Sequence, residues 1–216
     1  MGVLGAARRW CGMITPSLNE TARRMRDAAR GAGWPDGIAT EIGHAAAWLA
    51  ALGADGVGAA LAAIKEPSGP VDARQNGDAL WHIGPAPVAL AGPAALDLLF
   101  AGEGPVHVTF TDHRTLFLGL AGWASAQTGY RIRLEGAITV QIEAGHLLNA
   151  PHTDPTRRDL VLTARPGLPG APLPCGRHAP SPEAWEDALQ LSSRTLVPAT
   201  AASRAFGAGA GLGDGD

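Results

Sequence analysis

Hydrophobic residues in the first third of the chain recur every three or four positions, which is the period of an α-helix. Gly, Pro and capping residues divide this region into short segments. The pattern predicts helices from Ser17 to about Arg30, from Trp34 to Gly53 and, capped by Asp55, through Val57–Ile64. Ser17 and Glu20 form a capping box, in which the serine hydroxyl accepts from the Glu20 N–H. Short loops between the helices predict a small antiparallel bundle.

The period shortens to two from Leu80 onward, as in half-buried strands. We expect strands at Val106–Thr111, Thr115–Gly119, Tyr130–Leu134, Ala137–Ile142 and Asp159–Thr163. The first two are expected to form a hairpin around Asp112–Arg114. In the third, Arg131, Arg133 and Glu135 share one face, and Ile132 and Leu134 the other. Two further helices are expected, at Pro93–Phe100 with the proline in its first turn, and from Ser181 to about Ser193.

Together these elements predict an α+β fold. We expect a helical subdomain over residues 1–66 and an α+β subdomain over residues 78–216. The latter holds a mostly antiparallel sheet, a C-terminal helix and a Gly-rich tail. Met13 leads directly into the first helix, so we expect translation to start there rather than at Met1, with residues 1–12 not native.

Composition narrows the class of protein. The chain has 29 glycines, and Lys65 is the only lysine among 17 basic residues, a bias typical of a GC-rich genome. A net charge of −3 without a basic stripe argues against nucleic-acid binding. Two cysteines are too few for a disulfide scaffold, and no apolar stretch is long enough for a membrane span. We therefore expect a cytoplasmic protein that binds no membrane.

Two zones have candidate chemistry. The C-terminal zone combines arginines, hydroxyls and a glycine run: Arg194, Thr195, Ser203, Arg204, Gly207, Gly209 and Gly211. Backbone N–H groups of such a run can hold an anion, with arginines as charge partners. The alternative is a frayed terminus. In the N-terminal zone, Asn19 and Glu20 open a helix that also carries Arg30. Glu20 is either a general base or simply a capping residue.

Other candidates are less specific. His146, His152 and Asp154 lie close enough in sequence to form a metal-binding loop. Cys175 stands near Arg177 and His178, which favours a thiolate, although a lone cysteine in such a loop is more often inert. We interpret His44 as a solvated residue on the polar side of its helix. Common nucleotide-binding, zinc-protease and hydrolase motifs are absent from the sequence.

The Ser17-Leu18-Asn19-Glu20 start, the Ala28–Gly33 segment and the end with Arg194-Thr195-x-Val197-Pro198 and Ser203-Arg204 resemble a bacterial family of similar length without an assigned function. In that family the residue after Thr195 is usually aromatic, where this chain has Leu196. The resemblance implies that both candidate zones are features of the family. It implies no reaction.

We expect a cofactor-independent hydrolase or lyase that acts on a small, carboxylate-bearing metabolite. Glu20 would be the acid or base and Asn19 an orienting group. The remaining residues of the two zones would bind the substrate: Arg30, Arg194, Thr195, Ser203, Arg204, Gly207, Gly209 and Gly211. One alternative is a non-catalytic accessory subunit of a larger enzyme, and another is a metal-dependent enzyme that uses His146, His152 and Asp154. Whether the chain forms a homo-oligomer stays open.

Overall fold

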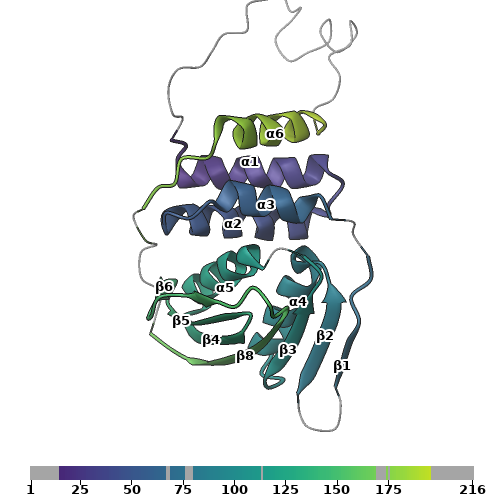
Figure 1. The fold of residues 1–216 in the computed structure, drawn as a ribbon, viewed down its shortest axis with the longest axis vertical. Coiled ribbons are helices and arrows are strands. Elements are labelled where there is room, and N and C mark those ends of the chain that lie inside the picture. Colours follow the sequence, from purple (N-terminus) through teal and green to yellow (C-terminus); the bar gives the residue numbers. More distant parts are fainter. Residues whose placement is uncertain are drawn as a thin grey trace, which may run out of the picture.

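The computed structural model describes residues 15–66, 69–75, 80–112, 114–168, 174 and 176–195. In these residues, layers of helices are stacked on one sheet (Figure 1). The helices are α1 (Leu18–Gly31), α2 (Asp36–Ala51), α3 (Gly56–Ile64), α4 (Val88–Phe100), α5 (Thr115–Thr128) and α6 (Pro182–Ser193). From the outside inward, the layers are α6, then α1, then α2 with α3, then α5 with α4, and finally the sheet.

The sheet is mixed but mostly antiparallel, which together with the helices confirms the α+β prediction. Its strands are β1 (Ala73–Gln75), β2 (Trp81–Ala86), β3 (Val106–Phe110), β4 (Tyr130–Gly136), β5 (Ile138–Glu143), β6 (His146–Leu147), β7 (His152–Thr153) and β8 (Asp159–Pro166). Their order is β1-β2-β3-β8-β4-β5-β6, and β7 pairs with β5. Only the β2–β3 pairing is parallel among the described strands.

Local capping signals place the ends of several helices as expected. The Ser17 hydroxyl accepts a hydrogen bond from the Glu20 N–H at 3.1 Å, and Ser181 caps α6 in the same way. Asp55 caps α3 through the N–H of Gly58. These short-range contacts depend on neighbouring residues alone, and the sequence therefore predicts them well.

The prediction of a strand at Thr115–Gly119 is wrong, because these residues form the start of α5. The expected hairpin around Asp112–Arg114 is also wrong, since β3 pairs with β2 and β8. The helix α5 packs against α2 on one side and against β4 and β5 on the other. A helix enclosed in this way is apolar all round and loses the amphipathic period by which helices are recognised.

The start of α4 also differs from the prediction. The helix begins at Val88, so Pro93 lies inside it rather than in its first turn. The carboxylate of Asp112, distant in sequence, accepts from the Val88 N–H at 2.7 Å and caps this end. The strand β2 went unpredicted because it contains Gly84 and Pro85, residues that are rare in strand interiors.

The two faces of the sheet differ in character. Residues such as Val108, Phe110 and Leu134 are buried against α4 and α5. The alternate residues of the same strands face the other way, where Figure 1 shows no helix covering the sheet. That open face is polar, and His107 and Arg133 lie on it. No helix among the described residues is long and apolar enough to cross a membrane.

Candidate functional site

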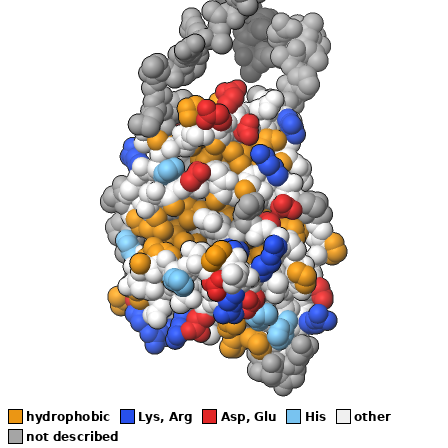
Figure 2. Space-filling view, in the orientation of Figure 1, with side chains coloured by type: hydrophobic (Ala, Val, Ile, Leu, Met, Phe, Trp, Pro, Cys, Tyr) orange, Lys and Arg blue, Asp and Glu red, His pale blue; other side chains and the backbone are white. Residues whose placement is uncertain are grey.

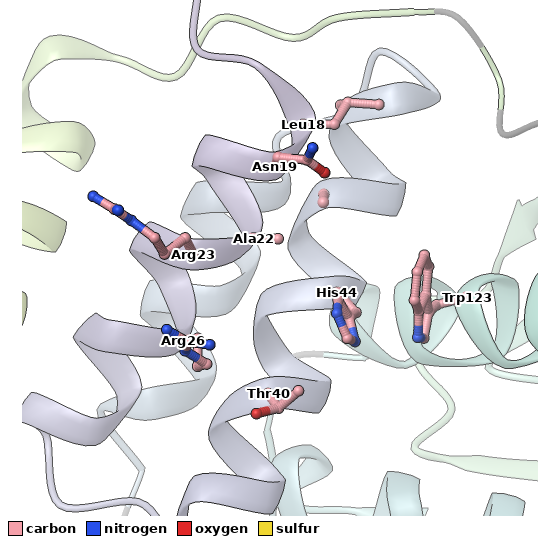
Figure 3. Close-up of a pocket in the computed structure, with 9 residues that line it drawn as sticks. Leu18, Asn19, Ala22, Arg23, Arg26, Thr40, His44 and Trp123 are labelled. Atoms are coloured by element: carbon pink, nitrogen blue, oxygen red, sulfur yellow. The ribbon is translucent and has the colours of Figure 1, made fainter.

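A groove of about 380 Å³ lies where α1, α2 and α5 meet. Figure 3 shows the residues that line it: Leu18, Asn19, Ala22, Arg23, Arg26, Thr40, His44, Ala47 and Trp123. Helix α1 contributes Asn19, Arg23 and Arg26, which share one face because they are spaced by four and three residues. Thr40 and His44 stand one turn apart on α2. We call this feature the α1–α2–α5 groove.

His44 is the most distinctive group in the groove. Its ring stacks on the indole of Trp123, with centroids 4.3 Å apart and an interplanar angle of 28°. The Nδ1 atom of His44 is buried and has no hydrogen-bond partner in the part of the chain that the structure describes. Burial lowers the pKa of His44 below its ordinary value, and the charge of Arg26 lowers it further. The imidazole is therefore neutral at pH 7, and the interpretation of His44 as a solvated residue is wrong.

Two guanidinium groups give the α1 wall of the groove its positive charge. Arg26 also donates to the Asp27 carboxylate, at 3.2 and 3.3 Å, which offsets part of its charge. Arg23 is exposed and makes no ion pair within the described part of the chain. Figure 3 shows its side chain at the rim, directed away from Trp123. An anion entering the groove would thus meet Arg26 beside His44 and Arg23 at the edge.

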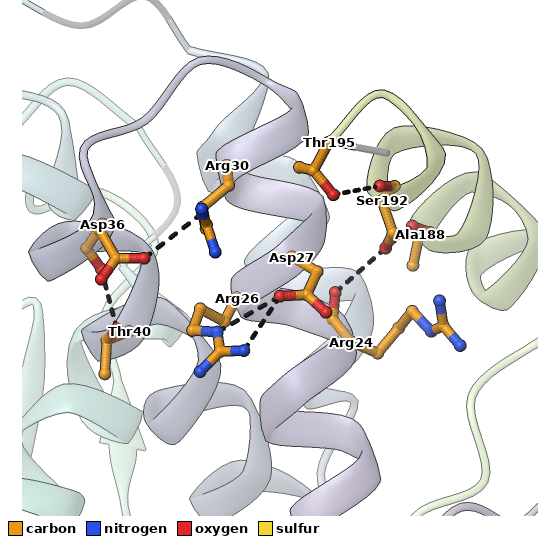
Figure 4. Close-up of polar contacts among 9 residues, drawn as sticks. All are labelled: Arg24, Arg26, Asp27, Arg30, Asp36, Thr40, Ala188, Ser192 and Thr195. Atoms are coloured by element: carbon orange, nitrogen blue, oxygen red, sulfur yellow. Dashed lines mark hydrogen bonds and ion pairs between the residues drawn. The ribbon is translucent and has the colours of Figure 1, made fainter. Parts of the chain in front are cut away.

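Only part of the predicted N-terminal zone lies in the groove. Asn19 lines it, but the neighbouring Glu20 is exposed and is not a lining residue. Arg30 lies ten residues further along the same helix, which is roughly 15 Å away at the usual rise per residue. There it pairs with Asp36 at 3.3 Å (Figure 4). The structure does not bring Glu20 and Arg30 together around one small ligand.

The described part of the C-terminal zone lies at the end of α6. Arg194 is the exposed C-cap residue, and the Thr195 hydroxyl donates to the Ser192 carbonyl at 2.7 Å. The Ser192 hydroxyl in turn reaches the Arg24 carbonyl at 3.4 Å and so connects α6 to α1 (Figure 4). The remaining predicted residues lie outside the described residues: Ser203, Arg204, Gly207, Gly209 and Gly211.

The proposed metal loop has no metal-binding arrangement. Searching the described residues finds no group of three or more His, Cys, Asp or Glu side chains that could hold a metal ion. Asp154 instead accepts hydrogen bonds from the backbone and hydroxyl of Thr156, at 2.9 and 2.6 Å. These bonds lower the pKa of Asp154 and stabilise a local turn. Cys175 lies outside the described residues.

A second polar cluster, on the open face of the sheet, was missed by the sequence analysis. His107 Nε2 lies 3.6 Å from a carboxylate oxygen of Asp159, and the His82 ring is 5.2 Å from that of His107. A hydrogen bond from Arg157 holds the pKa of Asp159 below its ordinary value. The pairing of β2 with β3 creates this cluster, and two histidines 25 positions apart give no local signal of it.

Comparison with known families matches the N-terminal part of the chain. Residues 16–92 match the model of a family described as Protein of unknown function (DUF3726). No curated protein and no solved structure matches the chain. The matched segment runs from the N-cap region of α1 into α4, and it holds every lining residue of the groove except Trp123. The chain thus carries a DUF3726 domain of unknown function over residues 16–92.

Proposed function

We propose that the chain is a cofactor-independent hydrolase or lyase that binds a small, carboxylate-bearing metabolite in the α1–α2–α5 groove. One observation carries this proposal: the neutral His44 ring has a buried nitrogen without a partner among the described residues, and it lies beside the guanidinium of Arg26. A buried polar atom without a hydrogen bond costs free energy, and such atoms are concentrated at sites that bind or react. A ligand that donates a proton or a hydrogen bond to Nδ1 would satisfy it.

The groove residues have distinct parts in this proposal. Arg26, and Arg23 from the rim, attract the carboxylate and hold it by charge-assisted hydrogen bonds. The amide of Asn19 orients the bound molecule, and Trp123 supplies an apolar wall. His44 takes the role of general base that the sequence suggested for Glu20, because His44 lines the groove and Glu20 does not.

Hydrolysis and elimination would share a first step here. A neutral imidazole can accept a proton either from water, whose oxygen then attacks the substrate, or from a carbon atom next to the carboxylate. In both reactions the guanidinium stabilises the carboxylate as negative charge develops near it. The His44 pKa, already lowered, keeps the ring in the proton-accepting form at pH 7.

The test compares carboxylate binding in matched variants. We expect succinate or citrate to raise the melting temperature of the parent protein, and Arg26→Gln to lose most of that rise. The ion pair of Arg26 with Asp27 is partly exposed, so its loss costs little stability. Arg177→Gln, an exposed arginine outside the groove, is the control for charge alone. Equal shifts in the parent and in Arg26→Gln would contradict the proposal.

Catalysis needs a separate test. We expect His44→Gln to keep carboxylate binding within about twofold and to abolish turnover, because the amide cannot take up a proton. Turnover of an identified substrate that survives this substitution would remove His44 from its proposed role. Glu20→Gln is the matched control, and it retains activity if Glu20 is only a capping residue.

A non-catalytic accessory subunit remains the alternative. This alternative rests on an Ala-rich helical face that could bind a partner. The Ala-rich helix α2, however, is buried between other layers of this chain. Purification of the untagged protein from its native host decides between the two. A larger partner at equal stoichiometry, with no turnover by the isolated chain, would favour the accessory subunit.

A further inference from the structure

Three arginines are gathered on the open face of the sheet, on the side away from α4 and α5. Arg131 and Arg133 belong to β4 and Arg165 belongs to β8. With Gln141, Thr163 and Ala164 they line a hollow of about 290 Å³, here called the arginine hollow. Figure 2 shows blue and red side chains together at the lower left edge of the molecule, below the β4–β5–β8 part of the sheet in Figure 1.

The strand register places like charges next to each other. Arg131 is directly opposite Arg165 in the β4–β8 ladder, and Arg133 is opposite Thr163 and so diagonal to Arg165. Side chains directly opposite each other on antiparallel strands are in contact distance, and like charges in that position destabilise a sheet. Folding stability alone therefore does not favour this arrangement.

Acidic neighbours neutralise only part of the charge. Arg131 donates to Glu143, whose side chain is buried, and this bond lowers the pKa of Glu143. Arg133 donates to Glu135 on the same strand. Arg165 makes no ion pair within the described residues. The hollow is left with one surplus positive charge.

One hydrogen-bond donor of an arginine that lines the hollow is also unused within the described part of the chain. The Nε atom of Arg131 is buried and has no hydrogen-bond partner among the described residues, although another nitrogen of the same guanidinium binds Glu143. Glu143 holds this side chain in place, and its other oxygen accepts from the N–H of Leu168 at 3.3 Å. The guanidinium is thus held in one place at the wall of the hollow.

We propose that the arginine hollow binds a phosphate group, either as inorganic phosphate or at the end of a small phosphate ester. A tetrahedral dianion can accept from Arg131 and Arg165 at once, and it cancels the repulsion between them. A single carboxylate brings only half that charge. The Thr163 hydroxyl and the Gln141 amide offer further hydrogen bonds. The arginine hollow is independent of the α1–α2–α5 groove, which lies among helices on the other side of the sheet.

The binding test uses isothermal titration calorimetry of the full chain in phosphate-free buffer at low salt. We expect both inorganic phosphate and glycerol 3-phosphate to bind, with Arg165→Gln weakening each about tenfold or more, as for loss of a charge-assisted hydrogen bond. Arg177→Gln removes the same charge elsewhere and should keep the parent affinity. Tighter binding of the ester identifies a phosphate ester as the ligand, and tighter binding of the ion identifies free phosphate.

Thermal unfolding separates binding from folding. Arg165 is exposed, and its replacement relieves a like-charge contact, so Arg165→Gln should melt no lower than the parent without ligand. Phosphate should then raise the melting temperature of the parent and of Arg177→Gln but not of Arg165→Gln. The proposal is overturned if neither compound binds at millimolar concentration, or if Arg165→Gln binds as tightly as the parent.

Discussion

The indole nitrogen of Trp48 donates a hydrogen bond to the backbone carbonyl of Gly145, 97 residues later in the chain, at 3.0 Å. This bond connects the C-terminal end of α2 with the turn between β5 and β6. Trp48 is fully buried, and Gly122 of α5 lies directly against its ring. Trp48 therefore joins α2 to α5 by packing and to the β5–β6 turn by a hydrogen bond.

The first prediction concerns this side chain. Trp48→Phe leaves the Gly145 carbonyl without its donor and opens a cavity, so we expect a loss of about 2–4 kcal/mol in the free energy of unfolding. Urea denaturation measures it. Trp81→Phe is the matched control, because the Trp81 nitrogen is buried without a partner among the described residues and its removal forfeits no bond to them. A loss in Trp48→Phe no larger than in the control would show that the Gly145 bond contributes nothing.

A second prediction follows from the contact between α5 and α2. A methyl group at Gly122 would overlap the Trp48 ring, so Gly122→Ala must force the two helices apart. We expect a loss of about 1–3 kcal/mol, as for other overpacked cores. At Gly37, near the start of α2, nothing lies within 4 Å of an added methyl group. Gly37→Ala should therefore be neutral or stabilising, and a similar loss in both variants would contradict the packing argument.

A third prediction concerns the docking of α6. A methyl group at Gly31 would overlap the carbonyl oxygen of Leu191, and backbone cannot move aside as a side chain can. We expect Gly31→Ala to displace α6 and to expose Trp185, which is buried in the parent. Tryptophan fluorescence should then shift to longer wavelength. The shift should vanish when Trp185→Phe is added, and its persistence would point to a different tryptophan.

The fourth prediction concerns pH. Burial raises the pKa of Glu41 above its ordinary value, and the nearby Asp97 carboxylate raises it further. The folded state therefore holds the Glu41 proton more tightly than the unfolded state, and stability is lost as the pH rises through the folded pKa. We expect Glu41→Gln to raise the free energy of unfolding at neutral pH, with a gain that shrinks as the pH falls through the folded pKa and is smallest below the ordinary value of 4.5. Glu186→Gln, an exposed change on α6, is the matched control for the loss of one carboxylate.

The sequence predicted those parts of the fold that depend on near neighbours. Ser17, Asp55 and Ser181 cap their helices as expected, because a cap is a contact over three residues. Alternation likewise identified β3 and β4. The sequence did not predict helix α5, because α5 packs against apolar neighbours on both sides and its own sequence therefore carries no helical period.

For the candidate sites, too, the sequence predicted what depends on near neighbours and missed what depends on contacts between distant segments. Asn19 was identified from its position at the start of a helix. The role of His44 in the groove depends on its stacking with Trp123, and Trp123 lies in α5, the helix whose start was predicted to be a strand. The shared face of Arg131 and Arg133 was visible in the alternation of β4. Arg165 was not included because its place opposite Arg131 is set by strand pairing, which one sequence does not reveal.

The layered architecture has a consequence for how the molecule opens. Helix α6 forms the outermost layer and packs on α1 and α3, whereas α2 is enclosed between α1 and α5 (Figure 1). Detaching α6 would expose Trp185 and Ala188 but would leave the buried contacts between the sheet and its helices intact. Regions with fewer buried contacts open at lower free energy than the core does. Backbone amides of α6 should accordingly exchange with solvent through local opening, while those of α2 exchange only when the whole chain unfolds.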